Sequence, residues 1–201
     1  PRGKVDGFSA GVYGTWYQND HNKLGAYADT WFQYGWFDQR VEGAGLPAVK
    51  YDAHGLAVSG EVGYAIPLRG GWVIEPQAQL IYVDYRQDDI AETNGTRIAG
   101  GDAHGPITRL GLRLHRTFVQ GDTRRIQPYL TLNWWHADTD RRMAFDRVTV
   151  GDLYPENRYE AKLGVNAQLD KRCTGWANLT GAWGEHSYHQ YVVRVGVKYT
   201  W

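Results

Sequence analysis

The sequence predicts an all-β protein, a transmembrane antiparallel β-barrel, on three observations. Nine segments alternate apolar and polar residues, as strands with one apolar and one polar face do. Short and long connections alternate along the chain, as they do when tight turns gather at one end of a barrel and longer loops at the other. The last segment, 191–201, alternates most strictly and ends on Trp201, which is typical of the closing strand of an outer-membrane barrel.

The composition fits this fold class. The 201 residues contain no apolar run near the ~20 residues of a membrane-spanning helix. A low mean hydropathy does not exclude a barrel, because only alternate residues of its strands face lipid. The 9 Trp and 14 Tyr suit aromatic girdles, whereas balanced charge (22 basic, 22 acidic) argues against a nucleic-acid partner. The single cysteine, Cys173, permits no internal disulfide.

The first four predicted strands lie near 7–18, 25–37, 55–66 and 72–85. Their apolar faces carry Phe8, Ala10, Val12 and Trp16, then Ala28, Phe32, Tyr34 and Trp36, then Leu56, Val58, Val62 and Tyr64, and then Ile74, Pro76, Ala78, Leu80 and Tyr82. Ile81 and Val83 break the pattern, because they fall on the polar face of the fourth segment.

The other five lie near 106–117, 126–136, 158–169, 175–184 and 190–201. Their apolar faces include Leu110, Leu112 and Leu114, then Leu130, Leu132 and Trp134, then Leu163 and Val165, and finally Val193, Val195 and Val197. The short connections are expected near 19–24, 67–71, 118–125 and 170–174. Long connections are expected near 38–54, 86–105 and 137–157, with a shorter one at 185–189.

The polar faces carry charges that would be costly to bury in an apolar core, whereas a water-filled lumen solvates them. We expect a lumen-facing set of Asp29, Trp31, Gln33, Glu61, Glu75, Arg109, Arg113, Lys162, Arg194 and Lys198. The acids come from the first half of the chain and the bases from the second half. The resulting field favours a hydrated polypeptide or ions over apolar solutes.

Several motifs lie along the chain in the order of one known family. They are Gly11-Val12-Tyr13-Gly14-Thr15-Trp16-Tyr17, Gly25-Ala26-Tyr27-Ala28-Asp29-Thr30-Trp31-Phe32-Gln33-Tyr34, Glu75-Pro76-Gln77-Ala78-Gln79-Leu80, Asn94-Gly95-Thr96-Arg97, Thr108-Arg109-Leu110-Gly111-Leu112-Arg113, Gln127-Pro128-Tyr129 and the closing Val195-Gly196-Val197-Lys198-Tyr199-Thr200-Trp201. With these residues the sequence resembles the C-terminal translocator β-domain of autotransporters, the type V secretion proteins, in their AIDA-like and pertactin-like branch.

The resemblance implies an outer-membrane pore that secretes an N-terminal passenger domain to the surface of a Gram-negative bacterium. Its implied partners are the outer-membrane bilayer, its own passenger and the barrel-assembly machinery, which would read an assembly signal at Val197, Tyr199 and Trp201. It implies no cofactor and no metal. The family barrel has twelve strands, so we expect 1–201 to be an N-terminally incomplete translocator domain, or one completed by strands from elsewhere.

Other roles stay open at this point. By resemblance, Asp29 or Glu61 is a candidate acid for cleavage of the passenger linker inside the barrel; the alternative is that they pair with Arg109 or Arg113 in the wall. Otherwise the chain is not expected to be an enzyme. Two rival classes are an outer-membrane rim enzyme of the protease or lipase kind, with His104 or His136, and a soluble lipocalin-like binding barrel.

Overall fold

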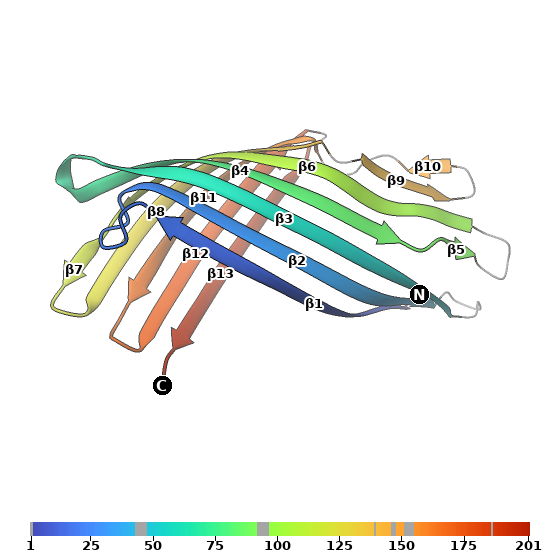
Figure 1. Cartoon of the computed structure of the whole chain (residues 1–201), viewed down its shortest axis with the longest axis horizontal. Helices are drawn as coiled ribbons and strands as arrows, with labels where there is room; N and C mark the ends of the chain where they lie inside the picture. The colour runs from blue at the N-terminus through green and yellow to red at the C-terminus, as the bar shows by residue number, and fades with distance from the viewer. Residues whose placement is uncertain are drawn as a thin grey trace.

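The structure is a computed structural model that describes residues 2–42, 48–91, 97–138, 140–145, 148–150, 155–185 and 187–201. Within these ranges, one curled antiparallel sheet has the strand order β1-β2-β3-β4-β6-β8-β11-β12-β13 (Figure 1). The long strands are β1 (Arg2–Tyr17), β2 (Gly25–Glu42), β3 (Val49–Pro67), β4 (Trp72–Gln87), β6 (Arg97–Arg116), β8 (Arg124–Ala137), β11 (Asn157–Gln168), β12 (Cys173–Gly184) and β13 (His189–Tyr199). Four short strands, β5 (Ile90–Ala91), β7 (Phe118–Gln120), β9 (Asp140–Phe145) and β10 (Val148–Val150), pair beside this path.

The apolar residues of the alternating segments lie on the outward face of the sheet. Val12 is 71 % exposed, Leu80 56 % and Val195 75 %. Among the described residues no large side chain is fully buried, and the buried apolar residues are three alanines. The sheet therefore has no apolar core of the kind that stabilises a soluble protein, and its exposed apolar face suits contact with lipid.

Several strands are longer than the sequence predicts. The apolar alternation stops near Trp36 and resumes near Leu56, but β2 continues to Glu42 and β3 begins at Val49. The expected loops at 38–54 and 86–105 are thus partly strand. The reason is that these extensions carry charged residues on the outward face, so they lack the apolar period by which a lipid-facing strand is recognised.

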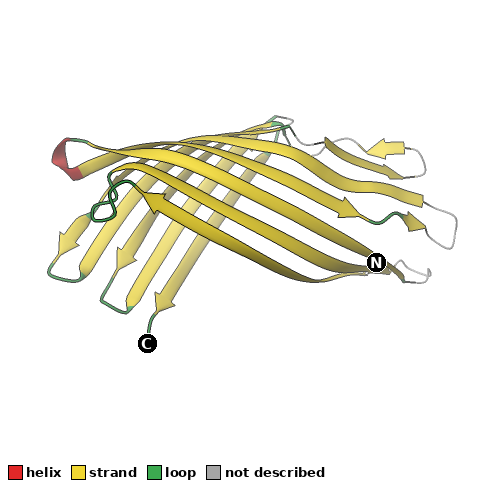
Figure 2. Ribbon diagram, in the orientation of Figure 1, coloured by secondary structure: helices red, strands yellow, loops and turns green. Residues whose placement is uncertain are grey.

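The tight turns gather at one end of the sheet, and the remaining connections lie at the other (Figure 2). The β3–β4 turn contains the 3₁₀ turn η1 (Arg69–Gly71), in which Gly70 and Gly71 have φ values of 73° and 77°. In the β11–β12 turn the carboxylate of Asp170 accepts the backbone N–H groups of Arg172 and Cys173 at 2.7 and 2.8 Å. These two hydrogen bonds hold the pKa of Asp170 below its usual value.

The first and last strands leave the sheet open. In the described part of the chain β1 pairs with β2 alone and β13 with β12 alone. Since neighbours alternate in direction along nine strands, β1 and β13 run the same way. An all-antiparallel closure therefore needs an odd number of further strands between them. Of the residues described, none forms a helix with the length and hydropathy to cross a bilayer.

Candidate functional site

The inner face of the sheet is the polar face, which carries Asp29, Glu61 and Glu75. Cross-strand pairing sets Asp29 of β2 opposite Glu61 of β3, and Glu75 of β4 opposite Arg113 of β6. Directly opposite residues of an antiparallel pair point to the same side, so these charges form rows across the sheet. The rows line a cavity of about 740 Å³, which makes this the hollowed side.

Arg109 lies at the centre of the hydrogen-bond network on this face. Arg109 is only 9 % exposed to solvent. Its Nη2 donates to Glu61 Oε2 at 2.6 Å and its Nε donates to Gln79 Oε1 at 2.8 Å. Its Nη1 donates to Asn133 Oδ1 at 3.1 Å and to Gln77 Oε1 at 3.2 Å. A buried guanidinium needs such partners, because its desolvation is otherwise strongly unfavourable.

The network extends to both sides of Arg109. Tyr27 of β2 donates its hydroxyl to Glu61 Oε1 at 2.8 Å. Asn133 of β8 donates to Glu160 Oε1 of β11 at 2.8 Å, and Lys162 lies 3.5 Å from the same oxygen. Side chains thus connect β2, β3, β4, β6, β8 and β11 on the inner face, in addition to the backbone ladder.

A second polar cluster lies nearer the tight turns. Glu75 Oε2 lies 3.1 Å from His115 Nε2, and His115 Nδ1 lies 3.3 Å from Gln127 Nε2. Gln127 Oε1 accepts a hydrogen bond from Arg113 at 3.2 Å, and the Arg113 guanidinium lies 4.8 Å from the centre of the Tyr129 ring. This cluster belongs to the lining of the 740 Å³ cavity.

The inner face becomes partly apolar toward the other end. Ile81, which breaks the alternation of β4, lines a smaller cavity of about 210 Å³ together with Ile107 and Trp135. The guanidinium groups of Arg109 and Arg158 lie 5.6 and 5.2 Å from the Trp135 ring centre. The exception in the sequence pattern therefore marks an apolar patch beside the central network.

The structure brings some of the predicted lumen residues together and leaves others apart. Glu61 contacts Arg109, whereas Asp29 accepts a hydrogen bond from Thr15 at 2.5 Å. Gln33 donates to Ser9 at 3.2 Å, and Trp31 lies opposite Ser59. On β13, Arg194 and Lys198 lie opposite Asn178 and Thr174; both are exposed and form no ion pair with any described residue.

The predicted lumen-facing set lacks several residues of this face, among them His115, Glu160 and Tyr27. His115 and Glu160 occupy polar-face positions of their segments, so the parity of the alternation was a usable signal. Tyr27 is an aromatic residue at a polar-face position, where its ring contacts Gly63 on the neighbouring strand. Its hydrogen bond to Glu61 depends on the register of β2 and β3, which sequence alone does not fix.

The rim histidines do not form a reactive cluster in the described part of the chain. Asp102 accepts the backbone N–H of Gln87 at 3.0 Å, and His136 Nδ1 lies 3.1 Å from Asn157 Oδ1. His104 of β6 lies opposite Asp84 of β4. No group of three His, Cys, Asp or Glu residues suited to a metal ion occurs among the residues described.

Comparisons with known proteins agree with this geometry. Residues 2–180 match the family described as Autotransporter beta-domain. Over 99 % of its length the chain is 35 % identical to uncharacterized protein YuaQ and 34 % to uncharacterized protein YdeU, both of Escherichia coli K12, and 30 % identical to the autotransporter adhesin AIDA-I of Escherichia coli. It spans 16 %, 46 % and 16 % of the length of these relatives, respectively.

Two solved structures share the fold. The transport unit of AIDA-I from Escherichia coli superposes with a TM-score of 0.79 at 28 % identity, and the β-domain of the Bordetella autotransporter BrkA with a TM-score of 0.73 at 27 %. Both matches cover 99 % of this chain. They cover 67 % of the AIDA-I unit and 75 % of the BrkA domain, so each of those folds contains structure that this chain does not supply.

Proposed function

Since the chain belongs to the autotransporter β-domain family, we propose that it forms most of the wall of an outer-membrane translocator that carries its own passenger domain to the cell surface. The observation that carries the proposal is the contrast between the two faces of the sheet. The outward face is apolar and exposed, and the inner face is a polar, charge-bearing wall around a cavity of about 740 Å³. In lipid every backbone group must be paired within the wall, which a closed β-ladder achieves.

The open edges imply that further strands complete the ladder in the working protein. β1 and β13 each leave one edge of the backbone unpaired in the described chain, and both run in the same direction. Such edges in a bilayer would leave rows of N–H and C=O groups without partners, at several kcal/mol per group. We propose that an odd number of antiparallel strands from another part of the protein lies between them.

The inner-face residues act on a passing chain by solvation rather than by covalent chemistry. Several charges on this face are paired within the wall, as Glu61 is with Arg109 and Glu160 is with Lys162. A hydrated, extended polypeptide can exchange hydrogen bonds with such a surface without a deep binding site. Asp29 lines the cavity but takes no part in the Arg109 network. Of the two candidate acids, Asp29 and Glu61, it therefore stays the better candidate for cleavage of the passenger linker inside the barrel.

The outward residues Val197, Tyr199 and Trp201 are proposed to present the signal that the barrel-assembly machinery recognises. All three side chains are exposed, Trp201 most of all at 97 %. Exposed aromatic side chains of a free edge strand are available to another β-sheet before the barrel closes.

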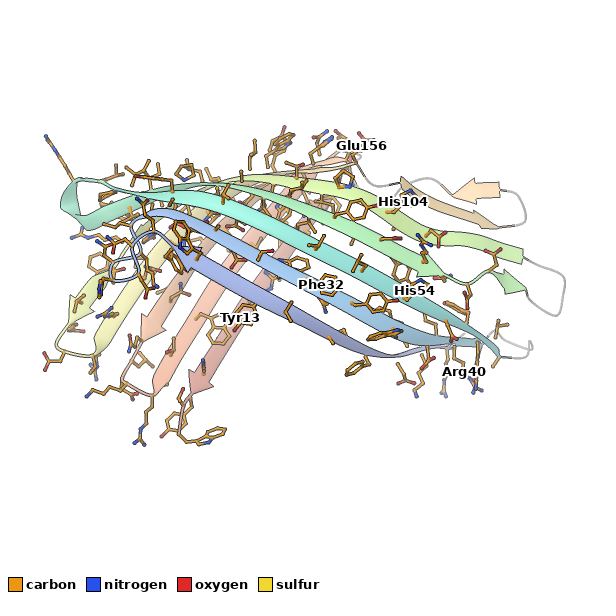
Figure 3. All side chains as sticks on the ribbon, in the orientation of Figure 1. Tyr13, Phe32, Arg40, His54, His104 and Glu156 are labelled. Atoms are coloured by element: carbon orange, nitrogen blue, oxygen red, sulfur yellow. The ribbon has the colours of Figure 1, made fainter. Side chains whose placement is uncertain are left out.

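Site-specific crosslinking tests the translocation proposal. A photo-crosslinking residue is placed at Gln33, which is exposed on the inner face of β2, or at its neighbour Phe32, which is exposed on the outward face (Figure 3). The full-length protein is given a passenger with an engineered disulfide, which stalls during secretion. We expect crosslinks to the passenger from position 33 and none from position 32. Equal crosslinking from both positions, or none from position 33, would contradict passage through this lumen.

A further inference from the structure

The outward face of β1, β2 and β3 carries an aromatic row near the end opposite the tight turns. Phe8 lies opposite Trp36, and Trp36 lies opposite His54. The rings of Phe8 and Trp36 stack with centroids 5.9 Å apart, and Tyr34 packs against Trp36 at 4.5 Å. Aromatic side chains concentrate at the two levels where a barrel meets the lipid head groups. This row therefore marks one boundary of the hydrocarbon band.

Two charged rows follow beyond the aromatic row on the same face. The first is an acidic row, in which Asp38 lies between Asp6 and Asp52. The second is a basic row, in which Arg40 lies between Lys4 and Lys50. All six side chains are exposed, and Figure 3 shows Arg40 near the far end of β2.

The depth of the basic row follows from strand geometry. At a rise of about 3.3 Å per residue, it lies roughly 13 Å along the strands from the aromatic row, since four residues separate Lys4 from Phe8. With strands tilted by about 40°, this is on the order of 10 Å along the membrane normal. The polar head-group layer on each side of the hydrocarbon is roughly 5–8 Å thick. The basic row thus lies at the outer side of the head-group layer.

The basic row has an electrostatic cost that an anion would remove. Neighbouring strands lie about 4.8 Å apart, and like charges directly opposite one another destabilise a sheet. Lys4 is paired with Asp6 at 2.6 Å and Arg40 with Glu42 at 2.7 Å. Lys50 forms no ion pair with any residue that the structure describes. Three cations in a line, one of them unpaired, complement the several acceptor oxygens of a phosphate group.

We propose that Lys4, Arg40 and Lys50 bind a phosphate group on the sugar head group of the phosphorylated glycolipid in the outer leaflet of the outer membrane. The proposal rests on the proposed function, because it requires the long-connection end of the sheet to face the cell exterior. The acidic row repels phosphate from the membrane side, so the phosphate lies on the far side of that row. The aromatic row beneath it contacts the acyl chains of the same lipid.

Lipid retention by the full-length protein tests this binding surface. The protein is purified in detergent, and bound lipid is counted by native mass spectrometry after titration with diphosphorylated lipid A or with the same lipid A lacking both phosphates. The test variant carries Lys4→Gln, Arg40→Gln and Lys50→Gln. The matched control carries Arg69→Gln, Lys171→Gln and Arg172→Gln, which remove three exposed cations at the tight-turn end.

We expect the wild type and the control to bind diphosphorylated lipid A at least tenfold more tightly than the dephosphorylated form. The triple variant should bind the phosphorylated form roughly a hundredfold more weakly, because each basic residue near a lipid surface contributes about fivefold. Excess inorganic phosphate should not displace the lipid, since it lacks the acyl chains. Displacement by inorganic phosphate alone, equal binding of the two lipids by the wild type, or equal binding by the wild type and the triple variant would overturn the proposal.

Two further measurements keep the test decisive. Should the triple variant fail to fold, as judged by heat-modifiable gel migration, Lys50→Gln alone should weaken binding about fivefold, and Lys50→Arg should restore it. Display of the passenger on intact cells is recorded for every variant. Failure of the wild type to display its passenger would count against the proposed function alone, whereas unchanged lipid binding by the Lys50→Gln variant would count against the lipid site alone.

Discussion

Arg109 shows how this sheet accommodates charge in a membrane protein. The side chain is buried, yet every guanidinium nitrogen has a partner on β3, β4 or β8, among them Glu61 of β3 at 2.6 Å. Each partner lies on the inner face, so the charge is compensated within the wall. A free charge at the same position would attract a passing chain far more strongly than a paired one. The network therefore stabilises the wall and leaves no unpaired charge at this position.

Replacing Arg109 should destabilise the folded domain more than replacing the whole ion pair. In the Arg109→Gln variant the Glu61 carboxylate loses its cation while it stays largely buried, which costs about 3–5 kcal/mol for a buried pair. The double variant Arg109→Gln, Glu61→Gln removes both charges and should recover part of this loss. The free energy of unfolding in urea, measured on the full-length domain in detergent, checks the expectation. Losses that simply add between Glu61→Gln and Arg109→Gln would contradict coupling of the two side chains.

At the scale of elements, neighbouring strands interlock through rings that lie over glycines. On the inner face Trp176 of β12 contacts Gly196 of β13, and Tyr129 of β8 contacts Gly164 of β11. Because glycine has no Cβ, the ring can lie flat on the partner strand, and the strands keep the tight curvature that a barrel requires. The many glycines that the sequence places in strands are thus partly explained by their aromatic partners.

A Cβ at Gly196 should therefore weaken the β12–β13 pairing. Gly196→Ala should cost about 1–3 kcal/mol, because the added methyl group overlaps the Trp176 ring. Gly60→Ala in β3 is the matched control, since nothing lies within 4 Å of a Cβ built there. Urea midpoints of the two variants provide the comparison. A control that loses as much stability as Gly196→Ala would show that the ring contact is not the cause.

The sequence predicts elements better than it predicts contacts. The nine alternating segments correspond to the nine long strands, because lipid on one side and water on the other impose a period of two. The small strands β9 (Asp140–Phe145) and β10 (Val148–Val150) were not predicted. They lie outside the lipid-facing segments and therefore lack the apolar alternation that lipid imposes. The partner of Glu61 was left open between Arg109 and Arg113. The register decides for Arg109, because Gln79 lies opposite both Glu61 and Arg109, whereas Arg113 lies opposite Glu75.

At the scale of the whole molecule, the described part of the chain is a curved wall with two free edges rather than a globule with a core. Its stability comes from backbone ladders, inner-face networks and the lipid that covers the outward face. The fold and the outer-membrane location follow from family membership together with this architecture, and the translocator role is proposed from them. The central proposal is that further strands complete the barrel. The 201-residue chain in isolation should therefore not form a closed barrel.

Heat-modifiable gel migration tests that statement most directly. Closed outer-membrane barrels resist detergent and migrate faster before heating than after it. The 201-residue chain is compared, after folding in detergent, with a chimera that adds the third of the AIDA-I transport unit that this chain does not cover. We expect the chimera to shift on heating and the 201-residue chain not to shift, because its β1 and β13 edges stay unpaired. A heat shift by the 201-residue chain alone, or none by the chimera, would contradict the proposal.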